Sequence, residues 1–462
     1  MTGIDMRRFS SRWLFSAGVF AFLGSALSVY AAPTLTSWTT QNGVRVYFVE
    51  SHAVPLINLQ VAFDAGSGRD PKEKAGLSIM TNRLLARGIR ATTHPLREPA
   101  LSESQISDGL ARTGAVRSDT VGKDRAGVSL LTLSSLDEAN RAVELVARSL
   151  AHPSFPADLL AREKKRVIAG IRESLTQPDS IAHREFSAEL YGAHPYGYRE
   201  TPETVASLTR EDLRSFHRAF YVADTAVITI VGDADRQRAE VIAEMLSVRL
   251  PVLGRKPPPL SAVEIREGQT RFILHSSAQS HILVGVPALS RGDPDFFPLI
   301  VGNYILGEGG FVSRLMREVR EKRGLAYHVF SRFEPLRQEG PFLLGLQTQK
   351  EQTGEALRVV RDVLAEWMRD GPTEEELSAA KDNLIKGFPL RIDNTRKILA
   401  QASLIGYYGL PLDYLNTWTD RVRAVTTADI RAAFLRHTPL DKLSTIVVGD
   451  VLPEKEPGSG KR

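Results

Sequence analysis

The chain carries ten histidines and no cysteine, and the spacing of these residues does not form a metal site. A common zinc-binding helix of hydrolytic enzymes has two histidines four residues apart, which bind the metal, and a glutamate between them, which acts as general base. No two histidines here are four residues apart, and the closest pair, His275 and His281, is six apart. His217 lies in SFHRAFY, without a carboxylate beside it. Each histidine is therefore predicted to be exposed or ordinarily hydrogen-bonded, and thiolate sites are excluded.

Motifs recur in the chain at a constant offset. VASLTREDLRSFHRAF at 205–220 is echoed by VRAVTTADIRAAFLRH at 422–437, and AVITIVGD at 226–233 by LSTIVVGD at 443–450. Both pairs are separated by 217 residues. Because several motifs share this one offset, the sequence predicts two copies of one domain, as the length of 462 residues also favours.

The pattern within each copy predicts strands at both ends and helices between them. Apolar strands open the first copy at 44–50 and 57–70, and the second at 270–276 and 281–295. Amphipathic helices follow, and TEEE at 373–376 resembles a capping box at the start of one of them. This order predicts an α+β fold of two homologous domains, each a mostly antiparallel sheet packed by helices.

The N-terminus has the pattern of a secretory signal. Three arginines precede an apolar run at 13–30, and the small residues of SVYAAPT follow. Residues 1–31 are therefore predicted to be a signal peptide cleaved after Ala31. An uncleaved membrane anchor is the alternative. The chain is expected in a periplasm or another exported compartment, with no stable membrane span after cleavage.

The remaining chain divides into four predicted parts. The first domain is expected at 32–250, a Pro-rich linker at 251–260, the second domain at 261–453 and a flexible tail at 454–462. Lys and Arg total 59 against 54 for Asp and Glu, and the small excess is spread along the chain. No nucleic-acid partner is therefore predicted.

Five segments resemble the pitrilysin/insulinase family of zinc peptidases, and the resemblance that rests on them covers nearly all of the predicted mature chain. They are FDAGSGRDPKEKAGL (63–77), HPYGYRETPETVASLTREDLRSFH (194–217), VGDAD (231–235), NYILGEGGFVSRLMREVREKRGLAYHVFS (303–331) and TEEELSAAKDNLIKGFPL (373–390). The resemblance implies a metallopeptidase-like fold of the LuxS/processing-peptidase type, in which such domains enclose a chamber where peptides are cut.

The same resemblance identifies where the zinc site of the family would fall. Gly76-Leu77 sets the register, which puts the first His at Ile79, the Glu at Asn82 and the second His at Arg83. The distal Glu aligns with Gly170. Ile has no lone pair, Asn is not a base, Arg repels zinc and Gly has no side chain. No metal is therefore expected in this chain.

The segment AGLSIMTNRLLARGI at 75–89 is still predicted to be an amphipathic helix. At 100° per residue, one face is predicted to comprise Leu77, Met80, Thr81 and Leu84. The roughly opposite face comprises Ile79, Asn82, Arg83 and Ala86, and the family would turn this face toward the chamber.

The second copy keeps a different functional pair. The resemblance singles out Arg320 and Tyr327, seven residues apart, as a pair that the family directs from the second domain at the active site. A phenol can donate to a developing oxyanion, and a guanidinium can hold a nearby carbonyl. The turn LGEGGF at 306–311, interrupted by Glu308, is expected near the substrate by the same resemblance, and the tract at 275–287 is a candidate chamber wall.

These features lead to one hypothesis and two alternatives. The hypothesis is a subunit without zinc in a two-subunit peptidase, docked on a zinc-bearing homologue, with peptide or unfolded protein as substrate. Arg320 and Tyr327 would reach the substrate at the partner's zinc, and extended peptides would pair with an exposed strand edge. One alternative is a non-enzymatic scaffold or peptide-binding module. The other is a lone peptidase with a rewired metal site.

Overall fold

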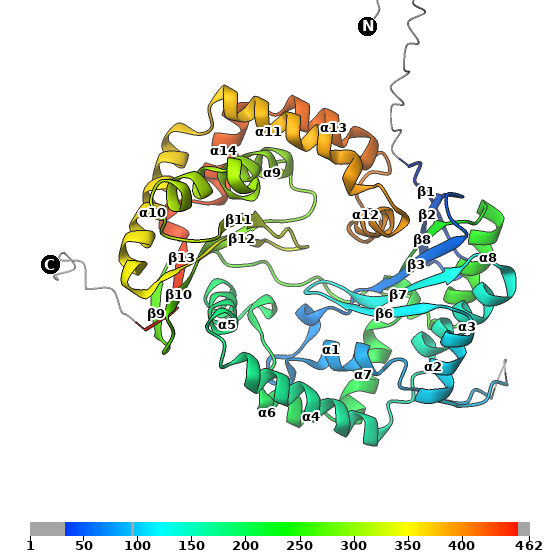
Figure 1. The fold of residues 1–462 in the computed structure, drawn as a ribbon. Coiled ribbons are helices and arrows are strands. Elements are labelled where there is room, and N and C mark those ends of the chain that lie inside the picture. The colour runs from blue at the N-terminus through cyan, green and yellow to red at the C-terminus, as the bar shows by residue number, and fades with distance from the viewer. Residues whose placement is uncertain (1–32, 94–96, 451–462) are drawn as a thin grey trace, which may run out of the picture. The chain divides into compact units, whose positions relative to one another are not determined.

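The structure is a computed structural model that describes residues 33–93 and 97–450 (Figure 1). The predicted signal at 1–31 and the predicted tail at 454–462 lie outside the described residues. Residues 33–93 and 97–450 all belong to one compact unit. None of the helices in these two ranges is both long enough and apolar enough to cross a membrane.

The first half of the chain forms a six-stranded sheet in the order β1-β2-β8-β3-β7-β6. β2 and β8 are parallel, and all other neighbours in this sheet are antiparallel. The strands are β1 (Thr36–Thr39), β2 (Arg45–Glu50), β3 (Leu56–Phe63), β6 (Val116–Val121), β7 (Ala126–Leu133) and β8 (Val227–Gly232). A separate pair, β4 (Gly88–Ile89) and β5 (Leu101–Ser102), lies outside this sheet.

The second half forms a five-stranded sheet in the order β11-β12-β10-β13-β9, in which only β13 and β9 are parallel. The strands are β9 (Thr270–Leu274), β10 (Gln279–Leu289), β11 (Val329–Phe333), β12 (Gly340–Gln349) and β13 (Ser444–Gly449). Read from the other edge, the order β9-β13-β10-β12-β11 matches, strand by strand, the order β2-β8-β3-β7-β6 of the first sheet. The predicted fold of two homologous α+β halves with mostly antiparallel sheets is confirmed.

The predicted chamber wall at 275–287 does not offer a free strand edge to a peptide. The tract at 275–287 runs into β10, which is hydrogen-bonded to β12 on one side and to β13 on the other. Since both edges of β10 are paired, this strand cannot add an extended peptide to the sheet.

Fourteen α-helices pack on and around the two sheets in the described ranges. They are α1 (Leu77–Leu84), α2 (Glu103–Arg112), α3 (Leu136–Ala151), α4 (Ala157–Ser174), α5 (Pro178–Tyr191), α6 (Pro202–Ser207), α7 (Arg210–Phe220), α8 (Arg236–Ser247), α9 (Phe296–Asn303), α10 (Thr353–Asp370), α11 (Glu374–Gly387), α12 (Thr395–Tyr408), α13 (Tyr414–Ala424) and α14 (Thr427–His437). The predicted capping box at Thr373 is present, and Thr209 and Thr426 cap α7 and α14 in the same way at the two repeat positions.

Each half lends one helix to the sheet of the other half. α12 packs on β8, β3 and β2, and α5 packs on β13 and β10 (Figure 1). The approach of α12 depends on Gly406, because a Cβ there would lie 2.5 Å from Cδ2 of Tyr47. Phe186 of α5 enters a buried cluster with Leu283 and Ile446 of the second sheet. The two sheets are therefore completed by helices that are distant in sequence.

A buried carboxylate joins the two halves at a second place. Asp124 follows β6, and its Oδ1 accepts a hydrogen bond from the Tyr196 hydroxyl. Its Oδ2 accepts from the Tyr408 hydroxyl at 2.7 Å and from the Arg337 N–H at 2.8 Å. Its backbone carbonyl accepts from the Tyr407 hydroxyl at 2.7 Å. One residue of the first half thus holds a loop and a helix of the second.

Candidate functional site

Helix α1, which carries three of the four degenerate zinc positions, is held at its start by a side chain of the preceding loop. It begins after Gly76, whose φ of +98° is a conformation that favours glycine. Asp70 accepts hydrogen bonds from the N–H groups of Gly76 (2.9 Å) and Ser78 (2.8 Å). Burial raises the pKa of Asp70 to about 7. The first turn of α1 is therefore fixed to the preceding loop.

The four predicted metal positions fall on two neighbouring helices, and none of them supplies a ligand. Ile79 and Arg83 are partly exposed on α1. Gly170 lies exposed on α4, which contacts α1, and the position of a Cβ there is open space. Since none of these residues bears an imidazole or a carboxylate, they do not fit zinc.

Asn82 differs from its expected place on the exposed face of α1. Its side chain is 0% exposed. Its Nδ2 donates to the Gly127 carbonyl and to the Tyr221 hydroxyl, both at 3.1 Å. The helical wheel misplaced Asn82 because α1 is covered by α7 on one side and by β6 and β7 on another, so more than one stripe is buried. Leu77, Met80, Thr81 and Leu84 are buried, as predicted.

We expect Asn82→Glu to lower the free energy of unfolding by about 3 kcal/mol, because it buries a carboxylate and removes the donor to Gly127. Urea denaturation followed by circular dichroism measures this. The control is Arg83→Gln, one position further and partly exposed, which should change stability by less than about 0.5 kcal/mol. A fully stable Asn82→Glu variant would mean that position 82 can still hold the family's general base.

Arg320 and Tyr327 lie together in one pocket of about 400 Å³. The Arg320 guanidinium lies 4.7 Å from the centroid of the Tyr327 ring and 4.7 Å from that of Phe311. Glu308 and Gly310 of the glycine-rich turn line the same pocket, as does β11. The structure thus brings the predicted pair together with the predicted turn. The role of these residues remains a prediction.

The local sequence explains how residues seven positions apart become neighbours. Arg320 is on a π-helical turn at Met316–Glu321, a form often found at functional sites. Gly324 ends this turn with a φ of +63°, and its N–H donates to the Arg320 carbonyl at 2.8 Å. The chain therefore reverses before Tyr327. Upstream, the buried Arg314 donates to both oxygens of Glu376 at 2.8 and 2.6 Å and anchors the turn on α11.

Both functional groups of the pair are free to bind something else. Tyr327 is 83% exposed. Within the described ranges, neither its hydroxyl nor the Arg320 guanidinium has a hydrogen-bond partner. Phe311 and Val312 beside them are also exposed, although both are large and apolar. Two donors in an exposed apolar surface are suited to a peptide backbone or a partner subunit.

His217 has the structural role that its sequence context predicts. It is buried on α7, its Nε2 donates to the Leu150 carbonyl at 2.7 Å, and its ring stacks on Tyr221 with centroids 5.2 Å apart. Burial lowers the pKa of His217 to about 4, because the charged form loses its hydration.

This pKa predicts a loss of stability in acid. A histidine whose pKa falls from 6.5 in the unfolded chain to about 4 in the folded one stabilises the fold fully above pH 6.5 and loses that contribution as the pH falls toward 4. The loss is about 3 kcal/mol for this group. Urea midpoints of His217→Gln should therefore fall less than those of the wild type between pH 7 and 4, and equally between pH 8 and 7. If the urea midpoints of the two proteins fell equally between pH 7 and 4, the lowered pKa of His217 would not be the cause of the acid loss.

One other group of residues in the described ranges has the composition of a metal site. Asp293, Asp295 and His437 bring their potential ligand atoms within 4.8 Å of one another. Asp295 already accepts from Arg436 Nε (2.9 Å) and Nη2 (2.8 Å) and faces His437 Nε2 at 2.9 Å. His437 Nδ1 lies 2.8 Å from the Ala288 carbonyl. These contacts explain the cluster as an ion-pair anchor of α14 at the start of α9.

Comparison with known proteins identifies the family. Residues 207–384 match the family described as "Peptidase M16 inactive domain". The crystal structure of a peptidase M16 inactive domain from Pseudomonas fluorescens superposes with a TM-score of 0.84, at 34% identity over 91% of this chain and 99% of that one. The chain therefore belongs to the M16 peptidase family, the pitrilysin/insulinase family that its motifs resemble. Within this family it is a member that lacks the zinc motif His-x-x-Glu-His.

Two curated relatives carry different descriptions. A protein of Bacillus subtilis described as "Uncharacterized zinc protease YmxG" is 27% identical over 79% of this chain and 86% of its own length. A protein of Helicobacter pylori named non-peptidase homolog YmxG is 23% identical over 94% of this chain and 98% of its own length. The similar proteins thus include one described as an uncharacterized zinc protease and one described as a non-peptidase homolog.

Proposed function

We propose that this chain is the subunit without zinc of a heteromeric M16 peptidase in an exported compartment. It docks on a zinc-bearing homologue and contributes to peptide-bond hydrolysis there. The observation that carries this proposal is the pairing of Arg320 with Tyr327 in one pocket, where neither polar group has a hydrogen-bond partner among the described residues.

The chemistry of the pair supports a role at the scissile bond. The Tyr327 hydroxyl donates a hydrogen bond to the carbonyl oxygen under attack, and this bond strengthens as the oxygen becomes an oxyanion. The Arg320 guanidinium holds a neighbouring backbone carbonyl and keeps the peptide in place. Phe311 and Val312 offer apolar contacts to substrate side chains or to the partner. The zinc and its general base belong to the partner.

The second candidate is a non-catalytic peptide-binding module or scaffold, which the relative named as a non-peptidase homolog favours. Such a module needs an exposed apolar surface but has no use for an oxyanion donor. The two candidates therefore differ in whether the Tyr327 hydroxyl affects turnover.

Co-expression with a zinc-motif homologue encoded nearby tests the proposal. We expect the two chains to co-purify, and we expect a quenched fluorescent unstructured peptide to be cleaved much faster by the complex than by either chain. A homologue that cleaves equally fast without this chain would overturn the proposed partnership. Co-purification without any gain in cleavage would favour the scaffold.

A further inference from the structure

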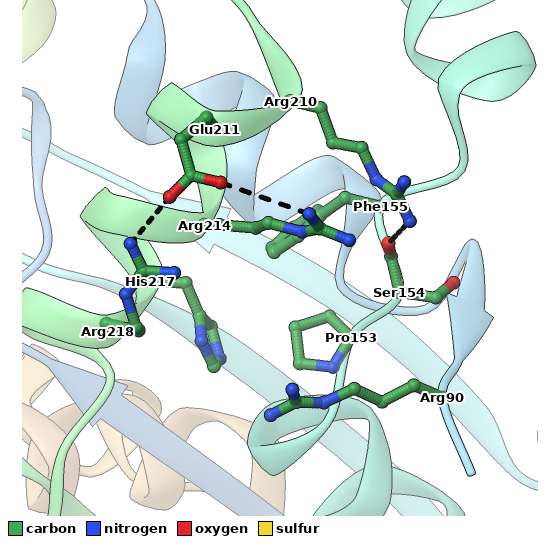
Figure 2. Close-up of a pocket in the computed structure, with 9 residues that line it drawn as sticks. All are labelled: Arg90, Pro153, Ser154, Phe155, Arg210, Glu211, Arg214, His217 and Arg218. Atoms are coloured by element: carbon green, nitrogen blue, oxygen red, sulfur yellow. Dashed lines mark hydrogen bonds and ion pairs between the residues drawn. The ribbon is translucent and has the colours of Figure 1, made fainter.

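A second pocket, which shares no residue with the Arg320–Tyr327 pocket, is rich in arginine. It has a volume of about 350 Å³ and lies between α7 and the segment that leads into α4 (Figure 2). Four of its nine lining residues are arginines, and one is a carboxylate, Glu211. The arginines are Arg90, Arg210, Arg214 and Arg218. Arg90 follows β4, and the other three come from α7.

The positive charge of this pocket is largely unbalanced. Arg218 Nη2 donates to Glu211 at 2.7 Å, whereas Arg214 reaches the same carboxylate only at 3.9 Å. Arg210 donates to a backbone carbonyl, that of Ser154, at 2.8 Å, which neutralises no charge. The Arg90 guanidinium has no hydrogen-bond or ion-pair partner among the residues described. One carboxylate thus faces four guanidinium groups in one open concavity, and the excess positive charge there attracts an anion.

The wall of the pocket is rigidly built. Phe155 has a φ of +49° and is the one residue other than glycine in the described ranges with a positive φ. Its ring is buried against His217, with centroids 5.8 Å apart. The Ser154 N–H donates to the Gly88 carbonyl at 2.9 Å, and the Arg90 N–H donates to the His152 carbonyl at 2.9 Å. Strained backbone of this kind persists only where packing fixes it, and it concentrates at ligand sites.

We infer that this pocket binds a multiply charged oxyanion of the phosphate class. Guanidinium groups donate paired hydrogen bonds that match the oxygens of such anions. An excess of several positive charges favours a multivalent anion over chloride, and the volume holds a ligand larger than a single halide ion. The phosphate group belongs either to a small soluble ligand or to a lipid headgroup. This site does not depend on the proposed peptidase function.

Calorimetric titration with inorganic pyrophosphate, at an ionic strength held constant with sodium chloride, tests the inference. We expect the wild type to bind, and Arg90→Ala/Arg214→Ala to bind about tenfold or more weakly, because charge-assisted hydrogen bonds are lost. Glu211→Gln should bind more tightly, since it removes the competing carboxylate. The control is Arg358→Ala on α10, outside the pocket. Like Arg214, Arg358 lies three residues after a glutamate, and its Nη2 is 3.7 Å from Oε1 of Glu355. Equal affinity in the double variant, or an equal loss in Arg358→Ala, would overturn the inference.

The source of the phosphate is tested by a second arm. Sedimentation with phosphatidylcholine vesicles containing phosphatidylglycerol detects binding to a lipid headgroup. Pyrophosphate binding without vesicle binding assigns the pocket to a soluble ligand, and vesicle binding that Arg90→Ala/Arg214→Ala abolishes assigns it to a lipid. If neither probe binds at millimolar concentration, the pocket is not an oxyanion site.

Discussion

Replacing Tyr327 with phenylalanine is expected to lower the turnover of the heteromeric peptidase about 100-fold. The substitution keeps the ring under the Arg320 guanidinium, which lies 4.7 Å from the ring centroid, and removes only the hydroxyl. Since that hydroxyl would donate most strongly to the developing oxyanion, kcat and kcat/KM should fall together while KM changes little. Steady-state cleavage of the fluorescent peptide measures all three quantities.

The matched control for this variant is Tyr198→Phe. The Tyr198 hydroxyl donates to the Ala193 carbonyl at 2.6 Å, outside the Arg320–Tyr327 pocket. We expect this control to keep full turnover. A Tyr327→Phe complex with wild-type kcat would exclude the Tyr327 hydroxyl from the reaction, and would leave the pocket as a binding surface alone.

Replacing Asp124 with alanine is expected to lower the free energy of unfolding by about 4 kcal/mol. The carboxylate is 3% exposed and accepts from Tyr196, Tyr408 and the Arg337 N–H, so its removal leaves one buried donor, the Tyr196 hydroxyl, and two partly buried donors unpaired. These donors come from both halves of the chain, and the variant should also make the loop and α12 easier to cleave. Urea denaturation and limited proteolysis measure the two effects.

Two further variants separate this effect from a general loss of charge. Asp441→Ala removes an exposed carboxylate that lies 3.8 Å from Lys442, and it should cost less than about 0.5 kcal/mol. Tyr408→Phe combined with Asp124→Ala should cost less than the sum of the single changes, because both remove the same contact. Additive losses, or a stable Asp124→Ala variant, would show that Asp124 does not join the two halves.

The sequence predicted the repeated fold because both copies carry their strands in the same order. β8 and β13 begin 217 residues apart, which is the offset between the segments AVITIVGD and LSTIVVGD in the sequence. The exchange of α5 and α12 between the sheets could not be predicted, since the contact of Gly406 with Tyr47 joins positions 359 residues apart. Periodicity reports which face of a helix is apolar but does not identify the sheet on which that face packs.

The candidate site was predicted in composition but not in geometry. The resemblance selected Arg320, Tyr327 and the glycine-rich turn, which line one pocket. The π-helical turn that carries Arg320 is too short to give the sequence a hydrophobic periodicity that distinguishes it from an α-helix. Asn82 was placed on the wrong face because its partners, Gly127 and Tyr221, lie 45 and 139 residues further along the chain. The arginine pocket was missed because Arg90 is 120 residues from the first arginine of α7.

Zinc content, measured together with peptide cleavage, tests the central claim most directly. This chain, the zinc-motif homologue and their reconstituted complex are analysed by mass spectrometry for bound zinc after dialysis against a weak chelator. We predict no zinc and no cleavage for this chain alone, and zinc equimolar with the homologue in a complex that cleaves the peptide. Stoichiometric zinc in this chain alone, with cleavage that a strong chelator abolishes, would contradict the account.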